Sequence, residues 1–134
     1  SAANQDTGSR LYQNAGALPF ADVASTAGVA EGALAPAAAW ADYDNDGDLD
    51  LVNANDFGQD RVYRVNADGT FTNVTDDTIG WDTHKGMNVE FGDFNNDGIL
   101  DLAAEQPRHA RQRVHVGREV QVVGDDFVAG RIGL

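Results

Sequence analysis

The chain repeats itself at an interval of 51 residues, and this self-similarity limits its possible folds more than any other feature of the sequence. Shifting the sequence by 51 positions superimposes its most distinctive residues without a gap, eleven of them identical. The identical pairs are Arg10 and Arg61, Tyr12 and Tyr63, Phe20 and Phe71, Val23 and Val74, Asp42 and Asp93, Asn45 and Asn96, Asp46 and Asp97, Gly47 and Gly98, Leu49 and Leu100, Asp50 and Asp101, and Leu51 and Leu102. Shared composition does not explain this concentration of aromatic, glycine and aspartate matches, so the repeat is real.

A third and weaker copy begins after Leu102, where Arg113-Val114-His115 takes the place of Arg61-Val62-Tyr63 with one residue inserted. The sequence therefore predicts a single β-repeat domain over residues 1–134 that holds about two and a half units. The units span approximately residues 9–59 and 60–110, with a partial unit at 111–134.

Apolar residues within a unit follow the period of two that is typical of short β-strands. Leu49 and Leu51 flank Asp50, and the segment 66–70 carries an Asp-Gly hairpin signal before a strand predicted at 71–74. Valines at 114, 116, 120 and 122 predict two further strands, with a turn at 117–119. Since no segment shows the pattern of a capped amphipathic helix, we expect an all-β fold.

Two aspartate-rich loops have the spacing of a metal site. Residues 42–50 place aspartates at loop positions 1, 3, 5 and 9 with glycine at 6, and residues 93–101 repeat this with one asparagine. A hard cation such as calcium takes six to eight oxygen ligands at about 2.3–2.6 Å, and alternate residues of a curled loop point inward. The side-chain ligands predicted for two calcium sites are Asp42, Asp44, Asp46 and Asp50 in one loop and Asp93, Asn95, Asp97 and Asp101 in the other. The backbone carbonyls of Asp48 and Ile99, at position 7, add a ligand to each.

Four other interpretations of these loops fit the sequence less well. An acidic solvated turn would leave five aspartates in nine residues to repel one another without a cation. An EF-hand needs glutamate at loop position 12, where this chain has Asn53 and Ala104, and it needs a helix on each side of the loop. A dockerin-type loop needs a helix after it, whereas the residues after position 9 here have the pattern of strands. Magnesium is a poorer match because it prefers a small octahedral shell that includes several waters.

The residues around these loops resemble the FG-GAP or VCBS-type repeats of integrin-α-like β-propellers. The resemblance is carried by residues 40–51 and 91–102, WADYDNDGDLDL and FGDFNNDGILDL, and it covers about residues 9–116. The segments Arg61-Val62-Tyr63 and 69–75 also look like a run found in secreted bacterial repeats of the ASPIC/UnbV-like group. The resemblance implies four-stranded blades, a structural calcium ion in each loop, and an extracellular or periplasmic location.

The number of units is too small for a closed ring, because a propeller needs about four to eight blades. We therefore expect a partial β-propeller that is cut from a longer one or that works bound to other protein subunits or further propeller blades. The start at Ser1 is taken as a sign of processing or truncation. The segment 108–134 is the expected junction, since it departs most from the repeat.

The charge and composition of the chain exclude several classes of partner and of chemistry. The net charge of −13 repels phosphate backbones, so no nucleic acid is expected, and the most apolar stretch, residues 27–41, is too interrupted to span a membrane. The chain has no cysteine for a disulfide, a thiolate site or a cysteine nucleophile. Arginines at 108, 111, 113 and 118 form a basic strip that either docks an acidic neighbour or is a solvated edge strand.

No catalytic constellation stands out. The histidines at 84, 109 and 115 share no ligand spacing, the serines at 1, 9 and 25 form no nucleophile elbow, and the glutamates at 31, 90, 105 and 119 show no paired spacing. Trp40 and Phe91, at equivalent repeat positions, are expected in the core, whereas Trp81 is a candidate surface aromatic for a glycan or protein partner. We therefore expect a non-catalytic, calcium-stabilised scaffold or interaction module. The alternative is a lectin-like or polysaccharide-active module on the same repeats.

Overall fold

The fold is almost entirely β-structure, as the period-two pattern predicts. The computed structural model describes residues 8–32, 34–80, 86–105, 113–116, 119–122 and 130–131. The strands are β1 (Tyr12–Gln13), β2 (Ala21–Asp22), β3 (Leu34–Ala41), β4 (Asp50–Asp56), β5 (Arg61–Val65), β6 (Phe71–Asn73), β7 (Asn88–Gly92), β8 (Asp101–Glu105), β9 (Arg113–Val116), β10 (Glu119–Val122) and β11 (Gly130–Arg131). Two one-turn helices, α1 (Ala24–Ala27) and α2 (Thr75–Thr78), were not predicted. Within the described residues, no helix has the length and apolarity that crossing a membrane requires.

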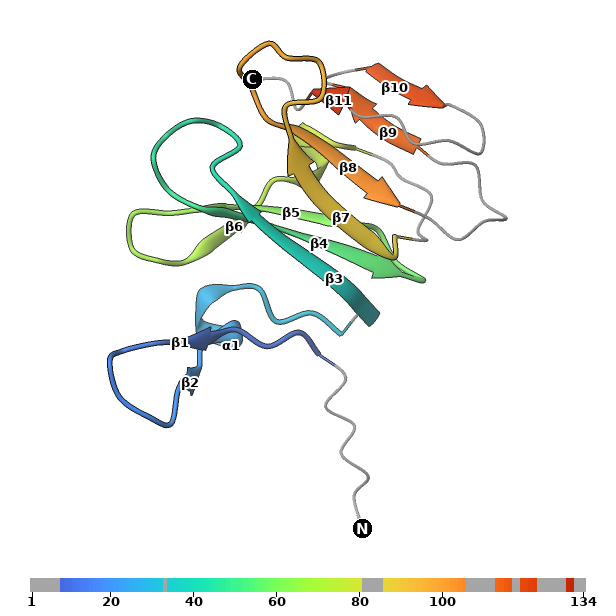
Figure 1. Cartoon of the computed structure of the whole chain (residues 1–134). Helices are drawn as coiled ribbons and strands as arrows, with labels where there is room; N and C mark the ends of the chain where they lie inside the picture. The colour runs from blue at the N-terminus through green and yellow to red at the C-terminus, as the bar shows by residue number, and fades with distance from the viewer. Residues whose placement is uncertain are drawn as a thin grey trace.

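The strands form two larger antiparallel sheets and one small hairpin (Figure 1). The first sheet has the order β3-β4-β5-β6, and the second contains β10-β9-β8-β11 with β7 also paired to β8. The hairpin consists of β1 and β2. Because the first sheet runs from residue 34 to residue 73, it combines strands from both of the units expected at 9–59 and 60–110.

The strand registers repeat at the same interval of 51 residues as the sequence. Tyr12 pairs with Asp22 as Tyr63 pairs with Asn73, and Trp40 pairs with Leu51 as Phe91 pairs with Leu102. Helices α1 and α2 also start 51 residues apart. The pair of Leu102 and His115 corresponds to the pair of Leu51 and Tyr63, which places the one-residue insertion between β8 and β9.

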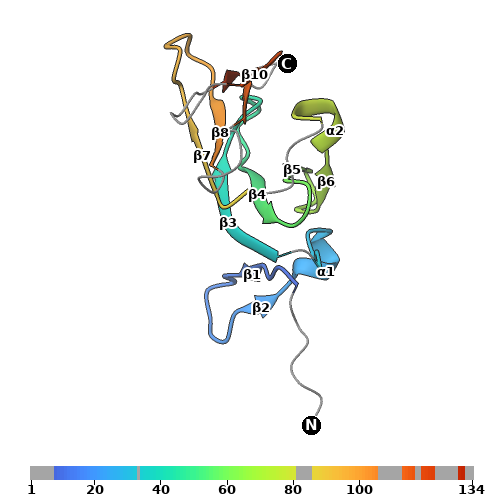
Figure 2. The same cartoon turned by 90° about the vertical axis from the view of Figure 1, so that its right-hand side faces the viewer.

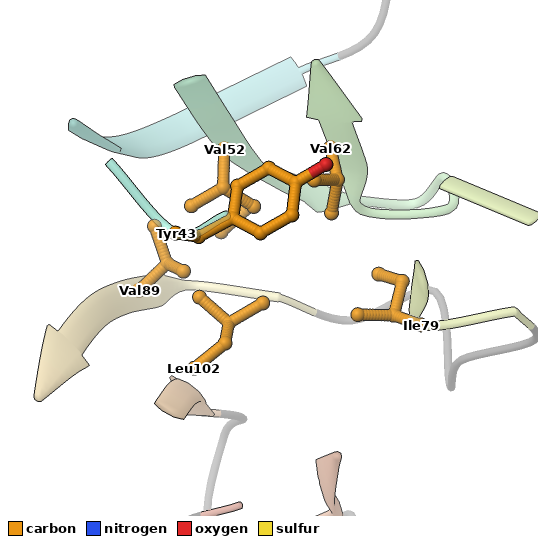
Figure 3. Close-up of a cluster of buried hydrophobic side chains, with 7 residues drawn as sticks. Tyr43, Val52, Val62, Ile79, Val89 and Leu102 are labelled. Carbon is orange, nitrogen blue, oxygen red and sulfur yellow. The ribbon is translucent and has the colours of Figure 1, made fainter. Parts of the chain in front are cut away.

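A hydrophobic core joins the two large sheets (Figure 3). Side chains of the first sheet and of the loop after β3 meet side chains of β7, β8 and the end of α2. The fully clustered members are Tyr43, Val52, Ala54, Val62, Ile79, Val89 and Leu102. Ala37 and Ala39 pack against this cluster, and their small side chains allow β7 to lie beside β3, which Figure 2 shows from the side. We call this cluster the intersheet core.

A second, smaller core lies on the opposite face of the first sheet. It brings Leu51 and Tyr63 into contact with Val29 and with the buried alanines of α1, and Leu11 and Phe71 pack at its margin. Helix α1 ends at Gly28, whose φ of 83° lies in the left-handed region that glycine tolerates. A Cβ at this position would lie 3.3 Å from the carbonyl oxygen of Phe71, so the glycine also allows close packing.

The prediction that Trp40 lies in the core is wrong. Its side chain is 46% exposed, although its ring contacts Phe71 edge-on with centroids 5.9 Å apart. Phe91, its repeat equivalent, is partly buried against the intersheet core. The two aromatics differ in what covers them. The face of the second sheet that carries Phe91 packs against the first sheet, whereas within the described part of the chain no further sheet packs on the face of the first sheet that carries Trp40.

Candidate metal centre

The first aspartate loop, residues 42–50, connects β3 to β4 and is closed by its own side chains. The two carboxylate oxygens of Asp42 accept hydrogen bonds from the backbone N–H groups of Asp46, at 3.0 Å, and Gly47, at 2.9 Å. The N–H of Asp48 donates to Asp46 Oδ1 at 3.0 Å. Asn45 and Gly47 have φ values of 59° and 96°, which asparagine and glycine adopt more readily than other residues. The DNDG sequence therefore encodes this tight curl.

The second loop, residues 93–101, has the same geometry between β7 and β8. Asp93 accepts hydrogen bonds from the N–H groups of Asp97 and Gly98 at 3.0 and 2.8 Å, and Asp97 Oδ1 accepts one from Ile99 at 2.9 Å. Asn96 has a φ of 61°, close to that of Asn45. In Figure 1 both loops, teal and orange, lie at the upper ends of their sheets.

Three carboxylates of the first loop converge. Asp42, Asp44 and Asp50 each offer an oxygen atom, and these atoms all lie within 4.8 Å of one another. Asp50 is completely buried at the start of β4, where its Oδ1 accepts a hydrogen bond from the N–H of Val65 at 2.9 Å. Its other oxygen, Oδ2, has no hydrogen-bond partner. A buried carboxylate oxygen without a partner is costly unless a cation compensates it.

The electrostatics of this triad reflect its crowded negative charge. Burial, followed by the charge of Asp46, raises the pKa of Asp44 above its usual value. Burial also raises the pKa of Asp50, and the neighbouring charge of Asp44 adds to that effect. The pKa of Tyr43 rises to about 12 through burial and the adjacent Asp50 carboxylate. A cation among these oxygens would favour the ionised carboxylates and so oppose these shifts.

The second loop keeps the buried carboxylate but lacks one acid. Asp101 is completely buried, its Oδ2 accepts a hydrogen bond from the N–H of Phe94 at 3.0 Å, and its Oδ1 has no partner. Asn95 takes the place of Asp44, and its Nδ2 donates to Asp97 Oδ2 at 3.2 Å. Asp93 and Asn95 are exposed, whereas Asp42 and Asp44 are half-buried. The second loop therefore has a more open cluster with less negative charge.

The remaining predicted ligands lie at the rims of the loops. Asp46 and Asp48 are exposed, and Asp46 Oδ1 accepts a hydrogen bond from the Asp48 N–H. Asp97 is exposed and makes the equivalent bond to Ile99. The structure thus groups Asp42, Asp44 and Asp50, and the ligand roles of all the predicted residues in both loops remain predictions.

A buried polar network at the other end of β4 was missed by the sequence analysis. Asn55 is 1% exposed, and its Nδ2 donates to the Gln59 carbonyl at 2.7 Å and to Glu31 Oε2 at 3.4 Å. Arg61 Nε lies 3.4 Å from Glu31 Oε1, and Asp60 accepts a hydrogen bond from the Asn55 N–H at 2.8 Å. Burial raises the pKa of Glu31, against the opposing charge of Arg61. Asn55, Asp60 and Arg61 follow Glu31 by 24 to 30 positions, and no sequence pattern links residues so far apart. Only the fold brings them together.

Several sequence candidates lie outside the described residues. They are Trp81, His84, His109, Arg108, Arg111 and Arg118. The side chains of Glu105, Arg113, His115 and Glu119 are also outside the description, although the backbone of His115 pairs with Leu102. Of the two glutamates whose side chains are described, Glu90 is exposed on β7 and Glu31 faces Arg61.

Comparison with known proteins found a similarity, in the region of the two loops. A search of curated proteins gave no match. Comparison with protein-family models matched residues 42–104 to the FG-GAP-like repeat. The matched segment begins at Asp42, the first residue of the first loop, and extends through β8, so it contains both loops and the strands between them. Residues 42–104 of this chain are therefore similar to the FG-GAP-like repeat, as the resemblance of the two loops predicted.

Proposed function

We propose that this chain is a non-catalytic, calcium-stabilised scaffold or interaction module of the β-propeller type, located outside the cell or in the periplasm. The FG-GAP-like repeat supports the propeller-type module. The observation that carries the role of calcium is that the buried aspartate at position 9 of each loop has one carboxylate oxygen, Asp50 Oδ2 or Asp101 Oδ1, without a hydrogen-bond partner.

The donor set fits calcium. The first loop offers three convergent carboxylates, and backbone carbonyls and water would complete the six to eight oxygen ligands that calcium takes. Asp42, Asp44 and Asp50 would hold the ion in the first loop, and Asp93, Asn95 and Asp101 would do so in the second. Bound calcium supplies charge neutralisation in this position. The ion would thereby fix each loop against the start of the strand that follows it.

In this proposal each of the two larger sheets serves as a blade. The sheets pack face to face through the intersheet core, as neighbouring units of a repeat array do. A propeller needs about four to eight such units, so further blades or other protein subunits would complete the assembly. The catalytic alternative, a lectin-like or polysaccharide-active module, predicts glycan binding or turnover, and a screen that found turnover of any polysaccharide would overturn the scaffold proposal.

Calcium should raise the thermal stability of the chain. Binding to the folded state alone contributes about 2.7 kcal/mol per site at a hundredfold excess over the dissociation constant. Differential scanning fluorimetry of the metal-depleted chain, with and without added calcium, should therefore show a higher Tm with calcium. An unchanged melting curve together with no calcium in elemental analysis would reject the proposal.

A pair of charge-matched variants separates ligation from general acidity. Asp50→Asn removes the buried carboxylate, whereas Asp48→Asn removes an exposed one and keeps the backbone carbonyl at position 7. Isothermal titration calorimetry should show at least a tenfold weaker calcium affinity at the first site for Asp50→Asn, a loss of about 1.4 kcal/mol or more, and a much smaller change for Asp48→Asn. Equal losses in the two variants would indicate nonspecific attraction by an acidic surface.

A further inference from the structure

One face of the first sheet is apolar and partly open. It consists of Pro36, Ala38 and Trp40 of β3 together with Leu51 of β4, and we call it the Trp40 face. Trp40 is 46% exposed, and Pro36 and Ala38 are also exposed. Between β3 and residues 9–11, which lead into β1, this face forms a groove of about 330 Å³, lined by residues that include Arg10, Leu11, Val29, Ala38, Trp40 and Leu51.

The internal repeat shows which structure covers such a face. The residues 51 positions after Ala38, Trp40 and Leu51 are Val89, Phe91 and Leu102. In the second sheet these three residues belong to the intersheet core or pack against it. They are covered by β3 and β4, whose alternate residues Ala37, Ala39, Val52 and Ala54 face them. An antiparallel strand pair with small apolar side chains at alternate positions is therefore the structure that this type of face accepts.

Strand β1 offers a matching edge. The β1–β2 hairpin has the register of β5–β6, because Tyr12 pairs with Asp22 as Tyr63 pairs with Asn73. On its other edge β5 pairs with β4, where Tyr63 lies opposite Leu51. Within the described ranges, β1 pairs with β2 alone. The backbone of Leu11 and Tyr12 therefore occupies the position that accepts a β4-type strand, next to the groove.

We propose that the Trp40 face and the open edge of β1 together bind a β-hairpin of the β3–β4 kind from another unit of the same repeat. One strand of the hairpin pairs antiparallel with β1, and the alanines and valines on one side of the hairpin cover Ala38, Trp40 and Leu51. This inference rests on the proposed role as an interaction module, and it does not depend on calcium binding by the chain.

A second copy of this chain is a poor donor of such a hairpin. The β3–β4 pair of that copy is already part of its own first sheet, where β4 is almost wholly buried between β3 and β5. The outward face of its second sheet carries exposed Asn88 and Glu90 at the positions of Ala37 and Ala39. These polar side chains would be buried against Trp40, at a cost that the alanines avoid.

A peptide of residues 34–56 with Trp40→Phe, which contains β3, the first loop and β4, can test the site in the full chain. In a Trp81→Phe background, Trp40 is the single tryptophan of the chain and reports on its own face. With saturating calcium, the peptide should bind at a ratio of one to one and protect Trp40 from acrylamide quenching. Trp40→Asp in the chain should weaken binding at least tenfold.

Charge-matched peptides test the orientation of the hairpin. Val52→Asp in the peptide places a charge on the side that covers Trp40 and should abolish protection, whereas Asn53→Asp points the other way and should keep it. Equal effects of the two peptides would overturn the inference. Concentration-dependent protection of Trp40 without peptide, with dimers in light scattering, would also overturn it, in favour of self-association.

An extended chain guards against poor folding of the isolated peptide. Residue 56 corresponds to residue 5 in the repeat, so a chain in which residues 34–56 directly precede residue 6 continues the repeat without a linker. This chain should melt at a higher temperature and protect Trp40, and Val52→Asp in the added copy should abolish both effects while Asn53→Asp does not. If Trp40 stays equally accessible in every extended chain, the inference is wrong. A calcium-dependent Tm would still support the proposed function in that case, so the two failures are distinguishable.

Discussion

At position 9 of each loop, one aspartate combines a structural and an electrostatic role. Asp50 and Asp101 are completely buried, and one oxygen of each accepts a backbone hydrogen bond that ties the loop to the sheet. The second oxygen has no hydrogen-bond partner. An asparagine in this position would keep the size and the hydrogen bond but lose the charge, which is why the charge-matched variants test the site at the scale of a single residue.

Glu31 gives a prediction about pH. Burial raises the pKa of Glu31 above its usual 4.5, so the folded chain binds more protons than the unfolded chain between 4.5 and that raised pKa. The stability contributed by this residue therefore falls as pH rises through that window. Urea unfolding of the calcium-saturated chain at several pH values should show a flatter stability profile for Glu31→Gln than for the parent chain.

The matched control for this prediction is Glu90→Gln, which removes the same charge from an exposed position. Its pH profile should follow that of the parent chain. Arg61 and Asn55 face Glu31 in both the parent chain and the control, so their contributions cancel in the comparison. An identical slope for Glu31→Gln and the parent chain would show that Glu31 does not titrate differently in the folded state.

At the scale of elements, a buried hydroxyl group helps to attach helix α2 to the first sheet. Thr75 is 1% exposed, and its Oγ1 accepts a hydrogen bond from the Val62 N–H at 3.0 Å and donates one to Asn73 Oδ1 at 2.6 Å. The backbone of Val62 also accepts a bond from the Val74 N–H at 2.8 Å. These bonds connect β5 to the start of α2, directly beside the intersheet core.

Replacing this hydroxyl should be costly. Thr75→Ala leaves the buried N–H of Val62 without an acceptor, so we expect a loss of about 1–3 kcal/mol in the free energy of unfolding. Thr75→Ser keeps both bonds and should lose about 0.8 kcal/mol for the missing methyl group. Denaturant unfolding of the two variants provides the measurement. Equal losses for alanine and serine would mean that packing, rather than hydrogen bonding, holds this helix.

At the scale of the whole molecule, the intersheet core makes the two sheets depend on each other. Leu102 is 1% exposed and contributes to this core from β8, while Val52 and Val62 contribute from the first sheet. Neither sheet buries this face without the other. The chain should therefore unfold in one cooperative transition that includes both sheets.

Leu102→Ala tests this dependence. Truncation of a buried leucine costs about 2–5 kcal/mol, and far-ultraviolet circular dichroism and tryptophan fluorescence should still report a single shared transition. Leu18→Ala, at a side chain that is 80% exposed, should change stability by less than about 0.5 kcal/mol. Two separate transitions in the Leu102→Ala variant would show that the sheets are independent units.

Sequence alone was sufficient for the features that local patterns encode. The interval of 51 residues, the β-rich class and the one-residue insertion before His115 all appear in the strand registers. The Asn-Asp-Gly segment of each loop favours the curl, because asparagine and glycine tolerate the left-handed backbone that Asn45 and Gly47 adopt. These features depend on residues close together in the chain or on identity between its copies.

Tertiary structure alone decided which residues come together over long distances. It made Trp40 exposed and its equivalent Phe91 partly buried, since burial depends on whether another sheet lies on that face. It also drew Glu31, Asn55 and Arg61 into one buried network and selected Asp42, Asp44 and Asp50 as the convergent carboxylates. The physical reason is that repeat identity fixes the local backbone and its hydrogen bonds, whereas desolvation depends on neighbours that are distant in the chain.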